Sequence, residues 1–275
     1  NDALQKARRL FSAAKGGHTG TLDPMATGLL PLCFGEATKF SADLLDADKT
    51  YEADVKLGIT TDTGDAEGQV LTNAAVTTSI ADVERLLPRF TGPIKQIPPM
   101  HSALKRDGRP LYELARQGIE VEREARDVTI HALDMLGLEG DVLRLRVSCS
   151  KGTYIRVLAA DIGQVLGCGA HLTALRRTRV GDLVLERSVT LSQLELQDEV
   201  QRGTHLLPVD ALLQSLPAVH LAAAEANRFS HGNPVTLPTG LLGKIRVYAE
   251  GRLLGVGEPG PGSLLWPKRL VQLAS

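Results

Sequence analysis

The sequence lacks the features that mark several classes of protein. Three cysteines, Cys33, Cys149 and Cys168, are an odd number without CxxC spacing, which excludes a disulfide framework or a cysteine-based zinc site. No apolar run is long enough to cross a membrane, and the first residues are polar and of mixed charge, unlike a signal sequence. These absences predict buried, reduced thiols in a soluble cytoplasmic protein without a membrane partner.

Strong net charge and cofactor motifs are missing too. The 31 basic and 32 acidic side chains nearly cancel, so overall charge cannot drive binding to nucleic acid, although a local basic surface could. The chain has no Walker motif, no GxGxxG after a strand and no HExxH, and its seven histidines lack metal-ligand spacing. We therefore expect chemistry that needs no metal, nucleotide or other cofactor.

The apolar patterns predict an α+β fold with a mixed, mainly antiparallel sheet. Leu143, Leu145 and Val147 alternate with polar residues, which is typical of a strand with one buried face. Helices and strands alternate irregularly, unlike a βαβ repeat. Helical periodicity falls at 4–14, 36–46, 79–88, 110–117 and 154–166, and β-rich patterns fall at 50–57, 126–136 and 142–149.

The 275 residues exceed the usual size of one domain, which predicts a large domain followed by a small one. From about residue 214 glycine and proline become frequent, and short β-like pieces alternate with turns. The pattern predicts a first domain over 1–213 and a compact β-domain over 214–275. The chain opens on Asn1, without Met, and runs directly into a helical pattern, so we expect its natural start to precede Asn1.

Residues 15–30, KGGHTGTLDPMATGLL, form the most unusual segment, with four glycines around one Asp. Asp23 has two interpretations. The Asp-Pro dipeptide alone favours a helix N-cap with Pro24 at the first helical position. Alternatively, Asp23 is a carboxylate nucleophile or base, exposed on a turn between an irregular loop and a buried helix.

The pattern GxxGxLDPxAxGxL over 17–30 strongly resembles the catalytic motif of the TruB family of tRNA pseudouridine synthases. The resemblance covers nearly the whole chain and is weakest in the tail, which is similar to a PUA domain, a small RNA-binding β-barrel. Family members carry a further strand and a Lys-Pro-Gly segment before the position of Asn1, which this sequence lacks. Further matching blocks, in chain order, are 48–51 with 57–65, 96–105 with 112–116, and 150–156 with 172–176.

The resemblance implies a catalytic domain of pseudouridine-synthase type that isomerises uridine at position 55, in the T-loop of tRNA. The reaction breaks the bond from base N1 to ribose C1′ and joins base C5 to C1′. It gains no atoms, so it needs no cofactor. Asp23 is then the catalyst, by attack at C1′, by attack at C6 or by assisting elimination to a glycal.

Two further catalytic residues follow from the resemblance. Arg156 stands near the start of a predicted helix, where a cation is unfavourable without an anionic partner. From the residues alone a surface ion pair is as good an explanation, but the family match places Arg156 beside Asp23. From the residues alone, Tyr51 is interpreted as a packed aromatic side chain whose hydroxyl is hydrogen-bonded. The resemblance implies that it stacks on the target base and helps to remove the C5 proton.

The target base must leave its stack in the T-loop before it can react. By resemblance His18 fills the gap that the flipped base leaves, Tyr154 supports the pocket, and Leu175 forms an apolar wall. Each of these is, by itself, more often a core residue than a site residue. The other expected substrate contacts are Lys151, Lys105, Arg116 and Arg176.

Basic residues cluster despite the neutral total. Residues 95–116 contain five basic and two acidic side chains, and Arg176, Arg177 and Arg179 form a short acid-free cluster. Such clusters are usually solvated faces, but they can also contact phosphates. The resemblance implies that 95–126 is a mobile thumb-like insertion that clamps RNA, and that tail cations meet the acceptor stem.

Two alternatives stay open. The chain could be a tRNA-binding or tRNA-folding chaperone in which catalysis is secondary or absent. It could also be a guide-RNA-dependent relative of the family, but the insertion at 95–126 and the short tail favour a stand-alone enzyme without guide RNA. No apolar stripe calls for a second subunit, which predicts a monomer.

Overall fold

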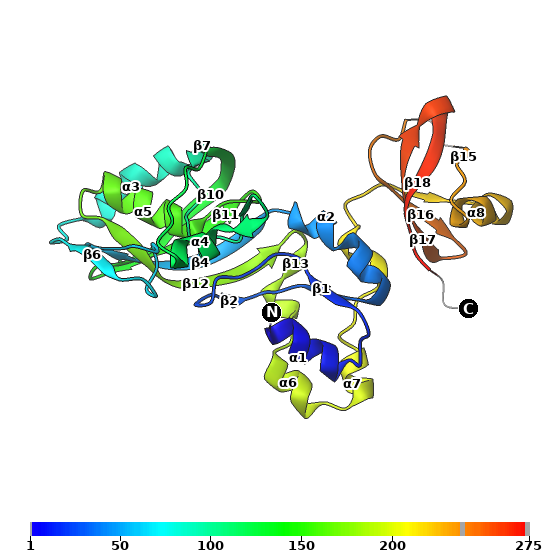
Figure 1. The fold of residues 1–275 in the computed structure, drawn as a ribbon, viewed down its shortest axis with the longest axis horizontal. Helices are drawn as coiled ribbons and strands as arrows, with labels where there is room; N and C mark the ends of the chain where they lie inside the picture. The colour runs from blue at the N-terminus through cyan, green and yellow to red at the C-terminus, as the bar shows by residue number, and fades with distance from the viewer. Residues whose placement is uncertain (1, 237–239, 273–275) are drawn as a thin grey trace. The chain divides into compact units, whose positions relative to one another are not determined.

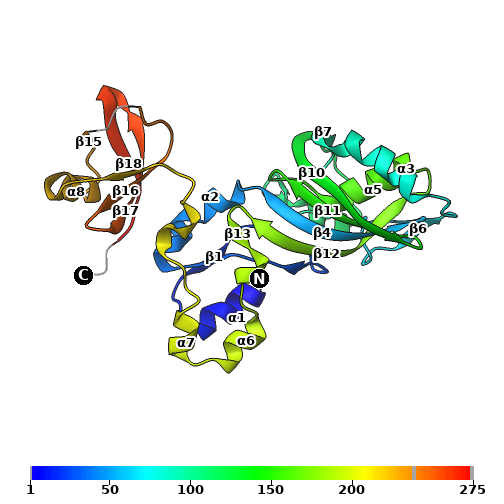
Figure 2. The same cartoon turned by 180° about the vertical axis from the view of Figure 1, so that it is seen from behind.

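The structure is a computed structural model that describes residues 2–236 and 240–272. Its contacts divide the chain into two units, each described here by itself. The sheet unit comprises residues 21–30 and 46–188, and the terminal unit comprises 1–20, 31–45 and 189–275. Figures 1 and 2 show the elements of both units from opposite sides.

A seven-stranded sheet forms the frame of the sheet unit. Its strands follow the order β13-β12-β4-β11-β10-β7, and β2 pairs with the edge of β12 that also carries β13. All pairs are antiparallel except β2 with β12, which is parallel. The strands are β2 (Thr27–Gly28), β4 (Lys49–Leu57), β7 (Gly92–Gln96), β10 (Arg126–Glu139), β11 (Val142–Cys149), β12 (Ala170–Val180) and β13 (Leu183–Val184).

One face of this sheet is apolar and the other is charged. As predicted, Leu143, Leu145 and Val147 of β11 are buried. Arg144 and Arg146 lie on the opposite face, where they pair with Asp54 and Glu52 of β4. Helices α3 (Ile80–Leu86) and α5 (Ile155–Val165) cover the apolar face and share one core with it.

Smaller elements complete the sheet unit. Strands β5 (Ile59–Thr61) and β6 (Val70–Asn73) form a hairpin. The segment predicted as an insertion contains a second hairpin, β8 (Lys105–Arg106) with β9 (Arg109–Pro110), followed by helix α4 (Leu111–Arg116). Leu111 and Leu114 of α4 are buried, which anchors this helix. The short 3-10 helices η2 (Leu87–Phe90) and η3 (Leu185–Arg187) also belong to this unit.

The terminal unit contains two groups of elements. The first consists of α1 (Asp2–Leu10), β1 (Gly16–His18), β3 (Leu32–Phe34), η1 (Gly35–Phe40), α2 (Ser41–Leu45), α6 (Leu191–Leu196), α7 (Glu199–Gly203) and η4 (Val209–Leu212). The second is a five-stranded sheet in the order β14-β16-β17-β18-β15 with helix α8. Its bounds are β14 (Ala218–His220), α8 (Ala223–Ser230), β15 (Val235–Thr236), β16 (Ile245–Ala249), β17 (Arg252–Gly260), η5 (Pro261–Ser263) and β18 (Leu264–Leu270).

The α+β fold class and the mainly antiparallel sheet are confirmed. The predicted helix over 36–46 is a 3-10 helix followed by one short α-helix, and the first helix ends at Leu10 rather than at 14. The division by contacts joins 189–213 to the tail, and the predicted boundary at residue 213 stays a prediction. In the described residues, no helix is both long and apolar enough to cross a membrane.

Candidate active site

Asp23 lies in a turn, not at the start of a helix. The backbone N–H of Ala26 donates to the Asp23 carbonyl at 2.9 Å, and Pro24 follows Asp23 as the first central residue of this turn. The prediction of a helix N-cap at Asp23, and of a buried helix after it, is wrong. Pro fixes its φ near the value that a turn also requires, and the chain then enters strand β2.

Gly28 lets this segment approach the sheet closely. Its φ is +101°, and a Cβ at this position would lie 2.2 Å from the carbonyl oxygen of Arg177. The next residue, Leu29, donates its backbone N–H to the same carbonyl at 2.8 Å. Only glycine satisfies both conditions, so segment 21–30 is fastened to β12 immediately after the turn that carries Asp23.

Arg156 forms a bidentate ion pair with Asp23. Its Nε donates to Asp23 Oδ2 at 2.9 Å, and its Nη2 donates to Asp23 Oδ1 at 3.2 Å. The Arg156 side chain is 5% exposed and that of Asp23 is 33% exposed. Arg156 is the second residue of α5, so the carboxylate supplies the anion that a cation at this helix end requires.

The remaining donors of Arg156 are also occupied. Nη1 donates to the Thr63 carbonyl at 3.0 Å, and Nη2 donates to the His101 carbonyl at 2.7 Å. Nη1 lies 3.5 Å from Oδ2 of Asp65, whose side chain is 6% exposed. The guanidinium is therefore held between two carboxylates and two carbonyls, which fixes its plane and, through it, the orientation of Asp23.

Asp65 is the site residue that the sequence did not reveal. Its Oδ1 accepts hydrogen bonds from Thr63 Oγ1 at 2.6 Å and from the Glu67 backbone N–H at 3.1 Å. Its other oxygen faces Arg156. The available signal was its place at the end of the matching block 57–65. The composition of 43–67 hid it, because acidic side chains are frequent in that stretch.

Tyr51 and Leu175 lie on the apolar face of the sheet beside this ion pair. Tyr51 in β4 stands opposite Arg177 in β12, and Leu175 stands opposite Ala53. Residues opposite each other in an antiparallel pair share a face. Burial raises the pKa of Tyr51, and the nearby Arg177 offsets part of this rise. The hydroxyl is therefore protonated at neutral pH.

Tyr154 is the N-cap residue of α5, two positions before Arg156. Its backbone N–H donates to Gln96 Oε1 at 3.0 Å, and its carbonyl accepts from Gln96 Nε2 at 3.3 Å. Burial raises the pKa of its hydroxyl, and the charge of Asp23 adds to the rise for both Tyr51 and Tyr154. The structure thus brings Asp23, Arg156 and the two tyrosines together.

The other predicted site residues are more dispersed. His18 is half-buried at the end of β1 in the terminal unit. Lys151 forms an exposed ion pair with Asp46 at 2.7 Å. Lys105 in β8 is exposed, and Arg116 at the end of α4 lies 5.5 Å from the ring centroid of Tyr112.

Arg176 is exposed, on the sheet face opposite that of Tyr51 and Leu175. Its neighbour Arg177 is 1% exposed. The interpretation of Arg176, Arg177 and Arg179 as one cationic surface cluster is therefore wrong, because adjacent residues of a strand point to opposite faces and the middle guanidinium is in the core.

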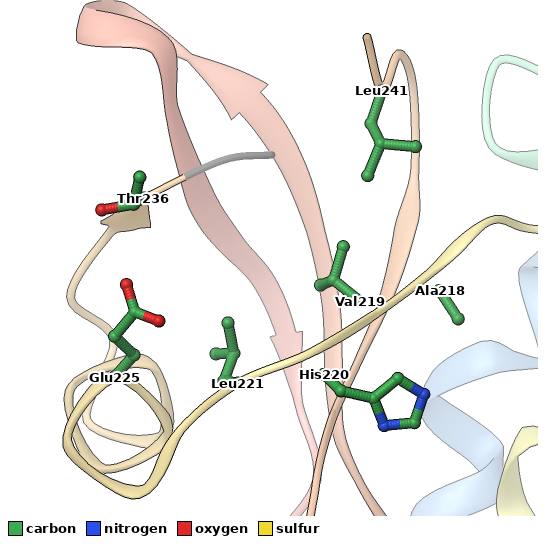
Figure 3. A pocket seen from close by; sticks show the side chains of 7 residues that line it. All are labelled: Ala218, Val219, His220, Leu221, Glu225, Thr236 and Leu241. Carbon is green, nitrogen blue, oxygen red and sulfur yellow. The ribbon is translucent and has the colours of Figure 1, made fainter. Parts of the chain in front are cut away.

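The terminal unit carries an open hollow beside its five-stranded sheet. Figure 3 shows residues of β14 and Leu221 on one side of it, with Glu225 of α8, Thr236 and Leu241 around the rest. The labelled side chains include one carboxylate and no Lys or Arg. This hollow therefore does not resemble a phosphate-binding surface.

The three cysteines are free and buried, as predicted. Burial raises the pKa of Cys33 and Cys149 to about 11 each, which suits inert thiols. Within 2–236 and 240–272, no group of three or more His, Cys, Asp or Glu residues is arranged to hold a metal ion.

Three family models match the chain in sequence. Residues 8–155 match the model described as TruB family pseudouridylate synthase (N terminal domain). The chain belongs to the TruB family. Residues 156–214 match the tRNA pseudouridylate synthase B C-terminal domain, and residues 217–271 match the C-terminal model of pseudouridine synthase II TruB. The five-stranded sheet at the C-terminal end of this TruB-family chain is PUA-like.

Relatives in the family are similar over almost their whole length. The tRNA pseudouridine synthase B of Dechloromonas aromatica (strain RCB) is 76% identical over 274 residues, which cover 100% of this chain and 92% of that protein. The tRNA pseudouridine synthase B of Aromatoleum aromaticum (strain DSM 19018 / LMG 30748 / EbN1) is 59% identical, over 98% of this chain and 88% of that protein.

Solved structures share the fold of this TruB-family chain. A chain in the crystal structure of a Cbf5-Nop10-Gar1 complex is 26% identical, with a TM-score of 0.71, over 92% of this chain and 72% of that one. A chain in the archaeal box H/ACA sRNP Nop10-Cbf5 complex is 22% identical, with a TM-score of 0.73, over 98% of this chain and 81% of that one.

Proposed function

We propose that this protein isomerises uridine to pseudouridine at position 55, in the T-loop of tRNA, as a stand-alone enzyme. The observation that carries the proposal is the bidentate ion pair between Asp23 and Arg156, at 2.9 and 3.2 Å, in a chain of the TruB family. The names of its relatives, tRNA pseudouridine synthase B, supply the substrate class.

The geometry fits the needs of a carboxylate catalyst. Arg156 pairs with both oxygens of Asp23 and is itself fixed by Asp65 and two carbonyls. A partly exposed carboxylate oxygen beside a buried cation can attack the flipped nucleotide, at C1′ or at C6, or assist elimination to a glycal. In each route the N1–C1′ bond breaks, a C5–C1′ bond forms, and the C5 proton leaves.

The aromatic side chains fit the roles expected from the resemblance. In this proposal Tyr51 stacks on the target base, and its hydroxyl helps to remove the C5 proton. Leu175 closes the apolar side of the pocket, and Tyr154 supports it from the start of α5. His18 occupies the place of the flipped base in the T-loop.

Binding of the tRNA rests on exposed cations. In this proposal 95–126 clamps the T-stem-loop, with Lys105 and Arg116 on phosphates, and Lys151 and Arg176 provide further backbone contacts. The domain over 214–275 meets the acceptor stem. Its cations are partly engaged already: Lys268 pairs with Glu258 at 3.4 Å, and Arg246 donates to the Leu216 carbonyl at 2.9 Å.

The proposed enzyme acts as a monomer in the cytoplasm, where tRNA is modified. It uses no guide RNA, since its own insertion over 95–126 grips the substrate. The domain limits are those predicted from the sequence, 1–213 for catalysis and 214–275 for RNA binding.

The test measures release of tritium from C5-labelled uridine in an unmodified tRNA transcript. We expect release with the protein, none with Asp23→Asn, and none from a transcript altered at position 55. The Asn side chain is isosteric but cannot act as a nucleophile or a base. Both proteins should bind tRNA equally. Release by Asp23→Asn at the normal rate would refute the role of Asp23. Binding without release by either protein would favour a tRNA-folding chaperone.

A further inference from the structure

A second buried arginine lies next to the proposed active site. Arg177 is 1% exposed, although a guanidinium is always charged and is costly to bury. The sequence placed it in a cationic surface cluster, and the reaction as described above assigns it no part. Its location in the core therefore requires a separate explanation.

The hydrogen bonds of Arg177 go to both ends of the segment that carries Asp23. Its Nε donates to the Leu29 carbonyl at 2.8 Å, and its Nη1 donates to the Thr21 carbonyl at 3.4 Å. Its own backbone carbonyl accepts from the Leu29 N–H at 2.8 Å. One residue of β12 thus ties down the chain two residues before Asp23 and six residues after it.

Arg177 also reaches the second proposed catalytic side chain. It stands opposite Tyr51 in the β12–β4 pair, on the same face. Its charge and a hydrogen bond to the Tyr51 side chain lower the Tyr51 pKa against the larger effect of burial. Asp23 lies in the turn before β2, and Tyr51 lies in β4. Arg177 bonds to the backbone on both sides of Asp23 and to the side chain of Tyr51.

We propose that Arg177 is a positioning residue for the isomerisation. Its guanidinium clamps segment 21–30 to β12 and so holds Asp23 and Tyr51 in a fixed position relative to each other. The inference rests on the proposed function. Geometry supports it in a specific way: the planar guanidinium donates in two directions at once, which a single ammonium cannot do with the same rigidity. Displacement of Asp23 by an ångström would lower the chemical rate without removing any contact to the tRNA backbone.

The experiment compares single-turnover rates of tritium release, the Kd for tRNA and thermal unfolding in four proteins: wild type, Arg177→Met, Arg177→Lys and Leu143→Ala. We expect Arg177→Met to lower the single-turnover rate by about a hundredfold while the Kd stays nearly unchanged. Arg177→Lys keeps the charge and should recover part of the rate. Leu143 is a fully buried residue of β11, opposite Leu138 of β10 and Val55 of β4, and it has no proposed role in the reaction, so its variant is destabilised but should keep the rate.

A neighbouring arginine supplies the contrast. Arg176→Met removes an exposed cation from the opposite face, so it should raise the Kd for tRNA and reduce its salt dependence, whereas Arg177→Met should leave the Kd nearly unchanged. Equal rates in folded Arg177→Met and wild type would overturn the inference, as would a loss confined to Kd. If Arg177→Met does not fold, Arg177→Lys decides: a folded variant with full rate overturns the clamp. A wild type without turnover would instead refute the proposed function.

Discussion

The proposed active site and the insertion over 95–126 both carry many charges, but they hold them in opposite ways. At the site Arg156, Asp65 and Arg177 are almost fully buried, with 4%, 4% and 1% of their surface exposed, and each donates to or accepts from fixed partners. In the insertion Lys105, Arg109 and Arg116 are exposed.

This difference separates two kinds of work. Charges that are buried among fixed partners do not reorganise when a reaction begins, so they can stabilise a transition state at low cost. Exposed charges have flexible side chains and are screened by salt, so they contribute to affinity and to the rate of encounter. Variants at the site should therefore change rates, and variants in the insertion should change affinities.

The largest effect is expected for Arg156→Lys. The ammonium keeps the charge but cannot bind Asp23 through two nitrogens while holding two carbonyls, so the single-turnover rate should fall by about a hundredfold or more. Tritium release with enzyme in excess measures it. A rate near that of wild type would show that charge alone, without orientation, is sufficient.

Arg156→Met separates stability from catalysis. It leaves Asp65 buried without its cation, which should lower the free energy of unfolding by about 3 to 5 kcal/mol. Adding Asp65→Asn removes the uncompensated charge and should restore part of that loss, measured by urea unfolding, while the rate stays low. Recovery of the rate together with stability would mean that Arg156 serves the fold and not the reaction.

A smaller effect is expected for Asp65→Asn alone. The Asn oxygen can still accept from Thr63 Oγ1 and from the Glu67 N–H, so the loop should keep its shape. Arg156 loses one of its two anionic partners, so its guanidinium holds Asp23 less firmly. The single-turnover rate should therefore fall by about tenfold. The Kd for tRNA is the internal control, because Asp65 is buried. An unchanged rate would show that Asp23 and the two carbonyls suffice to hold the guanidinium.

The contrast also explains what the sequence could reveal. Alternation in β11 and periodicity in α5 follow from local geometry, and both were predictable. The cap at Asp23 was mispredicted because Asp-Pro begins turns as well as helices. The pairing of β2 with β12, 149 residues away in sequence, decided between them. Asp65 and Arg177 could not be assigned, because only tertiary contacts distinguish a buried ion from a solvated one.

In the insertion, Lys105→Gln and Arg116→Gln should each weaken tRNA binding without a change in the single-turnover rate at saturating enzyme. Each lost phosphate contact should reduce the slope of log Kd against log salt by about 0.7 to 1. Arg85→Gln is a matched control, since Arg85 is an exposed cation on α3, outside the proposed RNA surface, and pairs with Asp82. A lower single-turnover rate in the insertion variants would contradict the expectation that these cations contribute to tRNA affinity alone.

The smallest effect concerns two of the three buried thiols, Cys33 in the terminal unit and Cys149 in the sheet unit. Burial raises the pKa of Cys33 and Cys149 from 9.0 to about 11, so near pH 8 their thiolate fraction should be about a hundredfold lower than in the unfolded chain. Iodoacetamide should label both slowly in the native protein and rapidly in urea, as measured by mass spectrometry, without loss of activity in the native sample. Because the folded state keeps a proton that the unfolded state loses, these thiols leave stability constant below pH 9 and lower it as the pH rises toward 11. Rapid native labelling of Cys149 alone would show that β11 opens locally next to the proposed site, and the rigidity ascribed to that region would then be wrong.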